Sequence, residues 1–167
     1  MDLTIIAAIA KNGVIGHNGR LPWNLAADTE HFRKTTMGSP VLVGRKTYEN
    51  IERRAGGPLP GQKNVVLTNT DDYATPEPVD TCSSIHRALI TLQNLSDTNA
   101  YIAGGESVYR QLLPMATRLK ITNIDRVYPG DAYFPQFDDS DWELVSETDA
   151  TGPITFETYE RNSPKTT

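Results

Sequence analysis

Short apolar segments alternate along this chain with stretches of helical spacing, and that alternation constrains the fold more than any other feature. Residues 3–10 form an apolar run with β-branched side chains, which is typical of a strand in the middle of a sheet. Further strands are expected at residues 40–44, 64–68, 100–103 and 117–124, with two more in residues 141–161 around a turn at residues 151–153. Helices are expected at residues 24–34, through Tyr48 and Ile51, at residues 84–95 and at residues 107–113.

Strands that alternate with helices predict an α/β fold with a mostly parallel sheet. The last two strands follow each other directly, so one antiparallel edge is expected and the sheet should be mixed. A chain of 167 residues suits one domain around one core. We therefore expect a single α/β domain over residues 1–161, with a central sheet of about eight strands flanked by about four helices, and a short C-terminal tail at residues 162–167.

Composition argues against several classes of function. The formal net charge of −5 disfavours nucleic-acid binding, which needs a basic surface. No apolar run approaches the ~20 residues needed to cross a bilayer, and Asp2 stands where a signal peptide carries a base. We therefore expect a cytoplasmic protein without a membrane partner. No pattern of metal ligands is found and no metal is predicted; the isolated Cys82 is interpreted as a partly buried thiol.

Two sets of polar residues are interpreted as surface. The histidines His17, His31 and His86 are scattered and form no catalytic pattern. Acidic residues gather late in the chain and are interpreted as a solvated face: Asp138, Asp139, Asp141, Glu143, Glu147 and Asp149.

The carboxyl ends of the strands are the expected place for a ligand, because open α/β sheets bind ligands there. That rule points to the loops after Ala10, Gly44, Thr68 and Ala103. The first loop, residues 11–23, is long and contains the turn signals Asn12–Gly13 and Asn18–Gly19. A loop of this length inside a compact domain is usually functional or mobile.

Asp28 is the first candidate for chemistry. We expect Asn24 to cap the helix that follows, and Asp28 and Phe32 share one face of that helix because they are four residues apart. On this apolar side the carboxyl should have a raised pKa and could bind a cationic or amidine-like heterocycle at two points. Alternatively, Asp28 is simply an acid in the first helical turn, where the helix dipole favours it.

Two strand-to-helix turns could hold an anionic cofactor. Gly44–Arg45–Lys46–Thr47 combines a glycine, two bases and a hydroxyl with the free N–H groups of a helix start. Ala103–Gly104–Gly105–Glu106–Ser107 has paired glycines that would allow close approach to a pyrophosphate. The alternatives are a capped turn with exposed bases and a tight turn without a ligand. Taken together with Asp28, the two turns would suit a dinucleotide and a flat polar substrate.

These residues resemble the dihydrofolate reductase family. Residues 15–16, 21–25, Asp28 and Phe32 are similar to its active-site loop and first helix, and residues 44–49 to its cofactor-phosphate turn. The other motifs follow in the family's order: residues 58–61, 64–68, 104–105 with 108–109, 122–125, and 130–131 with 134–135. The resemblance covers residues 3 to about 161, essentially the whole chain.

The resemblance implies NADPH-dependent reduction of 7,8-dihydrofolate to 5,6,7,8-tetrahydrofolate by hydride transfer. Asp28 would bind the pterin and promote its protonation, Trp23 would help to position a water and close a lid of residues 16–24, and Tyr109 would lie near the nicotinamide. The substrate would contact Ile6, Ala8, Thr29, Phe32, Ile51, Leu59, Gln62, Ala103 and Thr122, with Thr122 holding Asp28. The cofactor would contact Ala8, Ile15, Gly16, Asn18, Gly19, Gly44, Arg45, Lys46, Thr47, Leu67, Thr68, Asn69, Ala103, Gly104, Gly105, Glu106, Ser107, Val108 and Tyr109. Antifolate inhibitors and a monomeric state are also expected.

Three positions depart from the family's pattern. Gln62 replaces the arginine that many members use for the folate glutamate carboxylate, and Arg53, Arg54 or Lys63 could compensate because the loop at residues 52–57 looks long. Ser107 stands where some bacterial relatives have a phosphate-binding arginine, so Arg45 and Lys46 must contribute more to NADPH preference. Ala132 replaces the usual threonine after Gly130–Asp131.

Two other functions remain as alternatives. One is a related NADPH-dependent reductase of riboflavin synthesis, which would share the fold and the glycine turns. The other is a non-catalytic dinucleotide-binding or regulatory module. Pro22–Trp23 followed by Asp28 favours dihydrofolate reduction over both, because neither alternative needs that arrangement.

Overall fold

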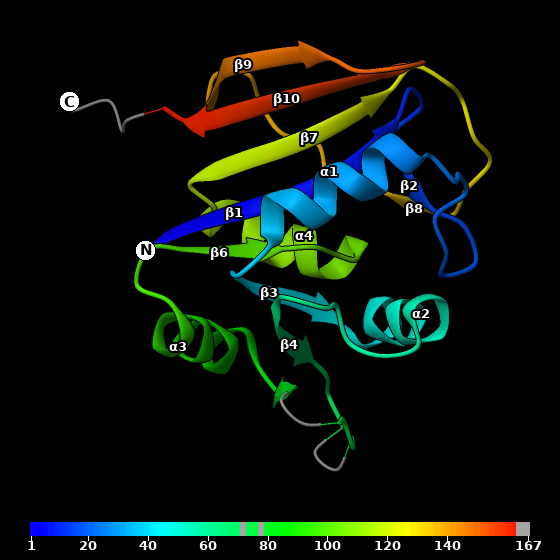
Figure 1. The fold of residues 1–167 in the computed structure, drawn as a ribbon. Helices are drawn as coiled ribbons and strands as arrows, with labels where there is room; N and C mark the ends of the chain where they lie inside the picture. Colours follow the sequence, from blue (N-terminus) through cyan, green and yellow to red (C-terminus); the bar gives the residue numbers. More distant parts are fainter. Residues whose placement is uncertain (71–72, 77–78, 163–167) are drawn as a thin grey trace.

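The computed structural model describes residues 1–70, 73–76 and 79–162. Figure 1 shows a central sheet with helices packed against it. The strands are β1 (Asp2–Ala10), β2 (Val14–Gly16), β3 (Pro40–Gly44), β4 (Lys63–Leu67), β5 (Asp80–Cys82), β6 (Asn99–Ile102), β7 (Arg118–Ile124), β8 (Ala132–Tyr133), β9 (Trp142–Asp149) and β10 (Ile154–Arg161). The helices are α1 (Ala26–Thr36), α2 (Arg45–Ala55), α3 (Ile85–Leu95) and α4 (Glu106–Leu112), and a 3₁₀ turn, η1 (Leu113–Met115), follows α4.

The main sheet has eight strands in the order β5-β4-β3-β6-β1-β7-β10-β9. Neighbours from β5 to β7 run parallel, whereas β10 pairs antiparallel with both β7 and β9. A mixed, mostly parallel sheet with an antiparallel edge is therefore confirmed. The short strands β2 and β8 pair separately as a two-stranded ribbon.

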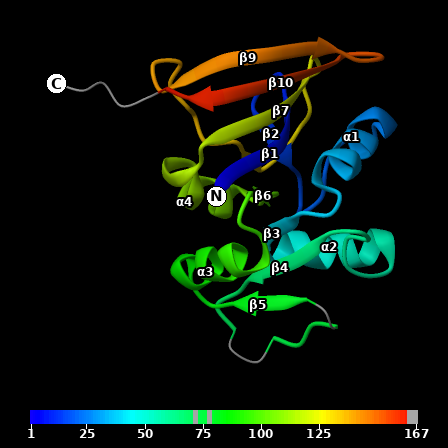
Figure 2. The same ribbon diagram turned by 60° about the vertical axis from the view of Figure 1, so that its left-hand side comes forward.

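The helices form two layers, one on each face of the sheet. Figure 2 shows α1 and α2 on one side of the strands and α3 and α4 on the other. One core cluster packs α3 and α4 against side chains such as Ile5 and Leu42, and a second packs Tyr48 of α2 against Ile6 and Val41. Adjacent residues of one strand thus point to opposite layers, because side chains alternate along a strand.

The strand and helix order agrees with the sequence-based expectation, but some local details differ. Asn24 does not cap α1, which begins at Ala26 after the extended residue Leu25, and no side chain closes its first turn. The expected loop at residues 52–57 is largely helical, since α2 continues to Ala55. The short strands β2, β5 and β8 were not predicted. They contain only two or three residues each, too few for the alternation that identifies a strand, and β2 and β8 pair across more than a hundred residues.

Other parts of the surface interpretation are partly confirmed. The side chains of β9 after Trp142 are exposed, as expected for the acidic face. Cys82 is buried in β5. His31 is half-buried and stacks on Phe156 at a centroid distance of 3.9 Å, so the expectation of a surface histidine was wrong for this residue. Of the expected tail, residues 163–167 lie outside the described part of the chain, and Asn162 bonds to the backbone of Asp141 and Ser140.

Within the described residues, every helix is too short or too polar to cross a membrane.

Candidate functional site

The carboxyl ends of β3 and β6 lie side by side next to the middle of β1, and there the two glycine turns touch. The Gly44 N–H after β3 donates a hydrogen bond of 2.8 Å to the Gly104 carbonyl after β6. Gly104 has a φ of +119°, a conformation that favours glycine, and a Cβ there would lie 3.4 Å from the Tyr109 hydroxyl. Thr47 of α2 reaches the same turn, because its hydroxyl is 3.3 Å from where a Gly105 Cβ would be. The two glycine turns therefore lie in contact with each other.

Tyr109 of α4 fixes the turn to the central strand. Its buried hydroxyl donates a hydrogen bond of 2.7 Å to the Ile6 carbonyl of β1. Burial raises the pKa of the Tyr109 phenol, and the charge of Asp28 raises it further, so the hydroxyl keeps its proton at all ordinary pH values. Because the hydroxyl already donates this bond, Tyr109 packs beside the turn and holds it against β1.

Asp28 lies in the first turn of α1 with only 9 % of its surface exposed, although a carboxylate is among the groups least often buried. Burial raises the pKa of its carboxyl, and the nearby Thr122 and Trp23 side chains counter part of that rise. Thr122 comes from β7 and is paired in register with Ala8 of β1, on the same face of the sheet. Asp28 is therefore an acid of the first helical turn, as the alternative interpretation expected, but it is buried on the apolar side of the helix.

Trp23 contributes an unused donor to this region. Its side chain is 6 % exposed and packs edge-on against Tyr128, with ring centroids 5.3 Å apart. The indole N–H is close enough to Asp28 to lower its pKa, yet it forms no hydrogen bond with any described residue. A buried unpaired donor is costly, so a water or ligand that accepts from it would be stabilised there.

Apolar side chains from several elements pack together on the face of the sheet that α1 and α2 cover. Phe32 of α1, Ile51 of α2 and Leu59 pack around one cluster with Ile6 and Ala103. Thr29, one residue beyond Asp28, is exposed and bonds back to the Leu25 carbonyl. The predicted substrate-binding residues Ile6, Ala8, Phe32, Ile51, Leu59, Ala103 and Thr122 are thus brought to one region of the fold.

The loop after β1 contains a tight reverse turn. Asn18 and Gly19 both have positive φ, 50° and 76°, which makes the type I′ turn that the Asn–Gly pair predicts. His17 and Arg20 pair across that turn by two backbone hydrogen bonds of 2.7 and 3.0 Å. Val14, Ile15 and Gly16 form β2 before the turn, and Trp23 follows it.

Asp131 holds this loop in place, and no role was predicted for it. Its N–H donates to the Gly16 carbonyl at 3.0 Å, and its carboxylate accepts from the Asn18 N–H at 3.1 Å. Gly130 makes this approach feasible, because a Cβ there would lie 2.3 Å from Val14 Cγ1 and 2.6 Å from the Gly16 oxygen. The Gly130–Asp131 motif was the only sequence signal, since the contact spans 113 residues.

Arg45, in the turn of residues 44–47, is held in place by contacts with three other side chains. Its guanidinium donates to Glu49 and to the Thr70 hydroxyl, both at 3.0 Å, and lies 4.3 Å from the centre of the Tyr73 ring. Lys46 is exposed. Leu67 ends β4, and Thr68 and Asn69 follow it, with Thr68 buried and Asn69 exposed.

A hydroxyl-rich cleft adjoins Arg45 through Thr70. It has a volume of about 190 Å³ and lies at the carboxyl ends of β4 and β5, beside α3; its lining residues are Thr68, Thr70, Thr81, Cys82, Ser83, Arg87 and Thr91. Arg87 is its cationic member, and sequence reasoning missed it. A spacing rule could have found Arg87 and Thr91, which are four residues apart on one face of a helix.

Several other predicted binding residues form hydrogen bonds to other parts of the protein. Gln62 Nε2 donates to Thr36 at the end of α1 at 2.9 Å, and Gln62 Oε1 is buried without a partner in the described chain. Lys63 donates to the Leu95 carbonyl at the end of α3, which directs it away from the site. Glu106 accepts from Arg110 and from the Tyr133 N–H, and Ser107 bonds to Gln111.

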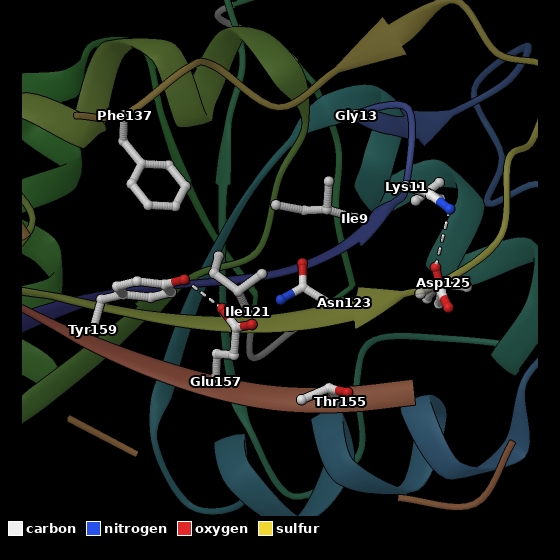
Figure 3. Close-up of a pocket in the computed structure, with 12 residues that line it drawn as sticks. Ile9, Lys11, Gly13, Ile121, Asn123, Asp125, Phe137, Thr155, Glu157 and Tyr159 are labelled. Carbon is white, nitrogen blue, oxygen red and sulfur yellow. Dashed lines mark hydrogen bonds and ion pairs between the residues drawn. The ribbon is translucent and has the colours of Figure 1, made fainter. Parts of the chain in front are cut away.

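A larger cavity, of about 460 Å³, is found on the opposite face of the sheet (Figure 3). Its floor includes Ile9, Ile121 and Asn123, whose sequence neighbours Ala8 and Thr122 face the candidate site. None of the predicted site residues lines this cavity. The chemistry therefore points to the Asp28 side, and the cavity is a separate feature.

Comparisons with known proteins agree with this arrangement. A family profile described as dihydrofolate reductase matches residues 2–161. The chain is 40 % identical to dihydrofolate reductase HdrB of Haloferax volcanii, covering 96 % of this chain and 84 % of that protein. It is 37 % identical to dihydrofolate reductase of Neisseria gonorrhoeae, covering 89 % and 88 %. A solved dihydrofolate reductase from Enterococcus faecalis, complexed with NADP(H) and RAB-propyl, superposes with a TM-score of 0.84 at 32 % identity, covering 97 % of each chain.

Proposed function

The chain belongs to the dihydrofolate reductase family, and on that premise we propose that it reduces 7,8-dihydrofolate to 5,6,7,8-tetrahydrofolate with NADPH, using Asp28 to bind the pterin and promote its protonation. The observation that carries this proposal is the burial of the Asp28 carboxyl close to Tyr109, whose ring borders the two contacting glycine turns. Family membership disfavours both a riboflavin-pathway reductase and a non-catalytic module.

The residues present fit NADPH. Gly44 leaves the first turn of α2 without a side-chain cap, so its backbone N–H groups remain available to phosphate oxygens. Gly104 and Gly105 keep the facing turn open to a close approach, and Thr47 adds a hydroxyl between the two turns. NADPH, when bound, supplies the hydride. Its phosphates would be held by Arg45, Lys46 and Thr47. Ile15 and the lid residues Gly16, Asn18 and Gly19 would close over it.

Arg87 and its hydroxyl-rich cleft would supplement Arg45 in this role. Ser107 offers no positive charge beside the glycine turn, whereas Arg87 and Arg45 flank Thr70 from α3 and α2. Arginine with several hydroxyls is a suitable set of donors for a phosphate group. This placement supports a contribution of Arg87 to NADPH binding.

The Asp28 carboxylate would accept hydrogen bonds from the amino group and the adjacent ring nitrogen of the pterin, a two-point arrangement that suits a carboxylate. Burial raises its pKa, which makes the carboxyl a better proton reservoir near neutral pH than a solvated aspartate. The proton is needed on the ring nitrogen beside the carbon that accepts the hydride. Thr122 would hold the carboxyl in position, consistent with its effect on the Asp28 pKa.

Trp23 would have two roles, in proton transfer and in closing the lid. Its buried, unpaired indole N–H can hold a water beside Asp28, which would connect the carboxyl to the pterin nitrogen. The lid of residues 16–24, which includes Trp23, would exclude bulk water, and this strengthens the electrostatic interactions inside. Phe32, Ile51 and Leu59 would line the folate pocket on the other side.

A test of the activity is simple: the purified chain is mixed with NADPH and dihydrofolate, and loss of NADPH absorbance is followed across salt concentrations. We expect oxidation that depends on dihydrofolate and stops with a diaminopyrimidine antifolate. Absence of NADPH oxidation at every salt concentration would contradict the proposal. The expectation of a monomer that binds neither nucleic acid nor membrane stays a prediction.

A further inference from the structure

We propose that the cavity on the reverse face of β1, β7 and β10 is a second small-molecule site, which takes a planar aromatic cation of the amidine or amino-heterocycle type (Figure 3). Its volume of about 460 Å³ falls within the ~300–1,000 Å³ typical of small-molecule sites. Nothing in the proposed reaction uses it, because its floor side chains point away from Asp28.

The floor of the cavity is built by strand register. Ile9, Asn123 and Thr155 form one row across β1, β7 and β10, and Ile121 and Glu157 belong to the next row. Phe137 and Tyr159 close one end, with ring centroids 5.4 Å apart in an edge-on arrangement. Figure 3 shows Lys11 paired with Asp125 at the other end, with Ile9, Ile121 and Asn123 between the two ends. The result is an apolar slot with a few polar groups, which suits a flat ring.

Two of those polar groups have unused hydrogen-bonding capacity. One oxygen of Glu157 accepts from the Tyr159 hydroxyl, while the other makes no hydrogen bond within the described chain. The Asn123 side-chain amide likewise makes no hydrogen bond to any described residue, although it is half-buried on the floor. A free carboxylate oxygen and a free amide oxygen can both accept from the N–H groups of an amidine.

The charge around the slot favours a cation over an anion. Glu157 faces Glu147 across the β9–β10 pair. Burial makes the largest contribution to the raised pKa of Tyr159. The negative charges of Glu157, Asp139 and Glu147 raise this pKa further. Lys11 is the cation among the described lining residues, and Asp125 lies 3.6 Å from it. An added positive charge is therefore attracted to this region.

The position of the slot connects it to the lid. Lys11 and Gly13 precede β2, and Phe137 follows β8, so the slot lies against the one end of the antiparallel β2–β8 ribbon where β2 begins and β8 ends. The Phe134 N–H donates to the Gly13 carbonyl at 3.1 Å, which joins the two segments at that end. An occupant would brace this ribbon, so turnover should slow while the KM for dihydrofolate stays unchanged. This part rests on the proposed function, whereas binding itself does not.

Benzamidine is the probe for this site. The ¹⁵N-labelled protein is first saturated with NADPH and a diaminopyrimidine antifolate, so that the Asp28 region is blocked, and benzamidine is then titrated. We expect saturable shifts at Gly13 and at the backbone and side-chain amides of Asn123. Glu157→Gln should weaken binding roughly tenfold, because a charged acceptor is replaced by a neutral one. Glu143→Gln on exposed β9, which does not line the slot, should bind as the parent does.

Several outcomes would overturn the proposal. These are an unchanged affinity in Glu157→Gln, equal binding of the neutral analogue benzyl alcohol, or no saturable shift with the antifolate in place. If Glu157→Gln does not fold, the benzyl alcohol comparison on the unaltered protein still decides. Binding that leaves kcat unchanged would overturn the link to the lid. Inactivity of the protein toward dihydrofolate would contradict the proposed function alone, because the titration does not depend on turnover.

Discussion

Two regions of the candidate site differ in how tightly the fold fixes them. The inner region, Trp23, Asp28 and Thr122, is buried and contributed by the lid, α1 and β7. The outer region, Arg45, Gln62 and Arg87, lies at the margins, where Arg45 and Arg87 are exposed and Gln62 is half-buried. The inner groups are placed by core packing, so their chemistry has little freedom to change. The outer groups are exposed or half-buried, so they can be exchanged for other bases or amides at little cost to core packing.

Asp28→Asn tests the inner region and should have the largest effect. An amide cannot supply a proton or balance a protonated pterin, so kcat near neutral pH should fall by roughly 10²-fold or more. Stopped-flow measurement of hydride transfer checks this, with Asp138→Asn on the exposed surface as the control. An unchanged rate would remove Asp28 from the mechanism.

Asp131→Ala tests how far the inner region depends on the lid. The change removes the carboxylate that accepts from the Asn18 N–H at 3.1 Å and leaves the backbone bond to Gly16. Such a hydrogen bond contributes about 1 kcal/mol, so its loss should lower kcat by about fivefold to tenfold. Turnover and lid hydrogen exchange are compared with Asp125→Ala, whose carboxylate pairs with Lys11 outside the lid. Equal exchange rates in the lid would contradict its holding role.

Arg87→Ala addresses the outer region through the cofactor. If Arg87 assists Arg45, the KM for NADPH should rise severalfold, and that for NADH should change little because NADH lacks the extra phosphate. Steady-state kinetics with both cofactors make this comparison, with Arg54→Ala at the end of α2 as a matched loss of charge. A similar rise for both cofactors would mean that Arg87 does not read the phosphate.

Gln62→Arg should have a smaller effect, in the opposite direction. Arginine can form a charged fork with the folate carboxylate, so the KM for dihydrofolate should fall by a few fold. The gain is limited because the new side chain gives up the Gln62 bond to Thr36. Gln62→Lys serves as the comparison, since it adds charge without the fork. If neither variant changes the KM, another base already binds the carboxylate.

The smallest expected effect is on stability. Because burial raises the Asp28 pKa, the folded state loses stability as pH rises through that pKa, where the buried carboxyl must ionise. Asp28→Asn removes this loss, so its Tm should exceed that of the parent near neutral pH. The difference should shrink as pH falls toward the ordinary aspartate pKa of 3.8. A pH-independent difference in Tm, followed by calorimetry, would mean that ionisation of Asp28 does not affect stability.

Much of the fold could be predicted because it follows local periodicity. The apolar runs of β1, β3 and β4 and the Asn18–Gly19 turn depend on residues that are close in sequence. The start of α1 could not be predicted in this way. Asn24 has the side chain of a cap, but Leu25 occupies the capping position in extended backbone, with φ −114° and ψ 109°, where the lid joins the helix.

The residues of the site likewise fall into two groups, those placed by nearby sequence and those placed by contacts between distant segments. Sharing a helix face with Phe32 was enough to place Asp28 on the apolar side, because that relation is local. The Asp131 contact with the lid and the Gln62 bond to Thr36 join distant segments, and no periodicity encodes them. Lys63 illustrates the limit: it neighbours Gln62 in sequence, yet strand alternation sends it to the Leu95 carbonyl on the α3 side.

The central claim is that Asp28 supplies the protonation that accompanies hydride transfer. The most direct measurement is the pH dependence of the hydride-transfer rate, with saturating NADPH and dihydrofolate, for the parent and for Asp28→Asn. The account predicts that the rate of the parent declines above the raised pKa of the buried carboxyl, and that the variant partly recovers as pH falls, because solvent can then protonate the substrate. Parallel profiles for the two proteins, separated by a constant factor, would contradict the claim.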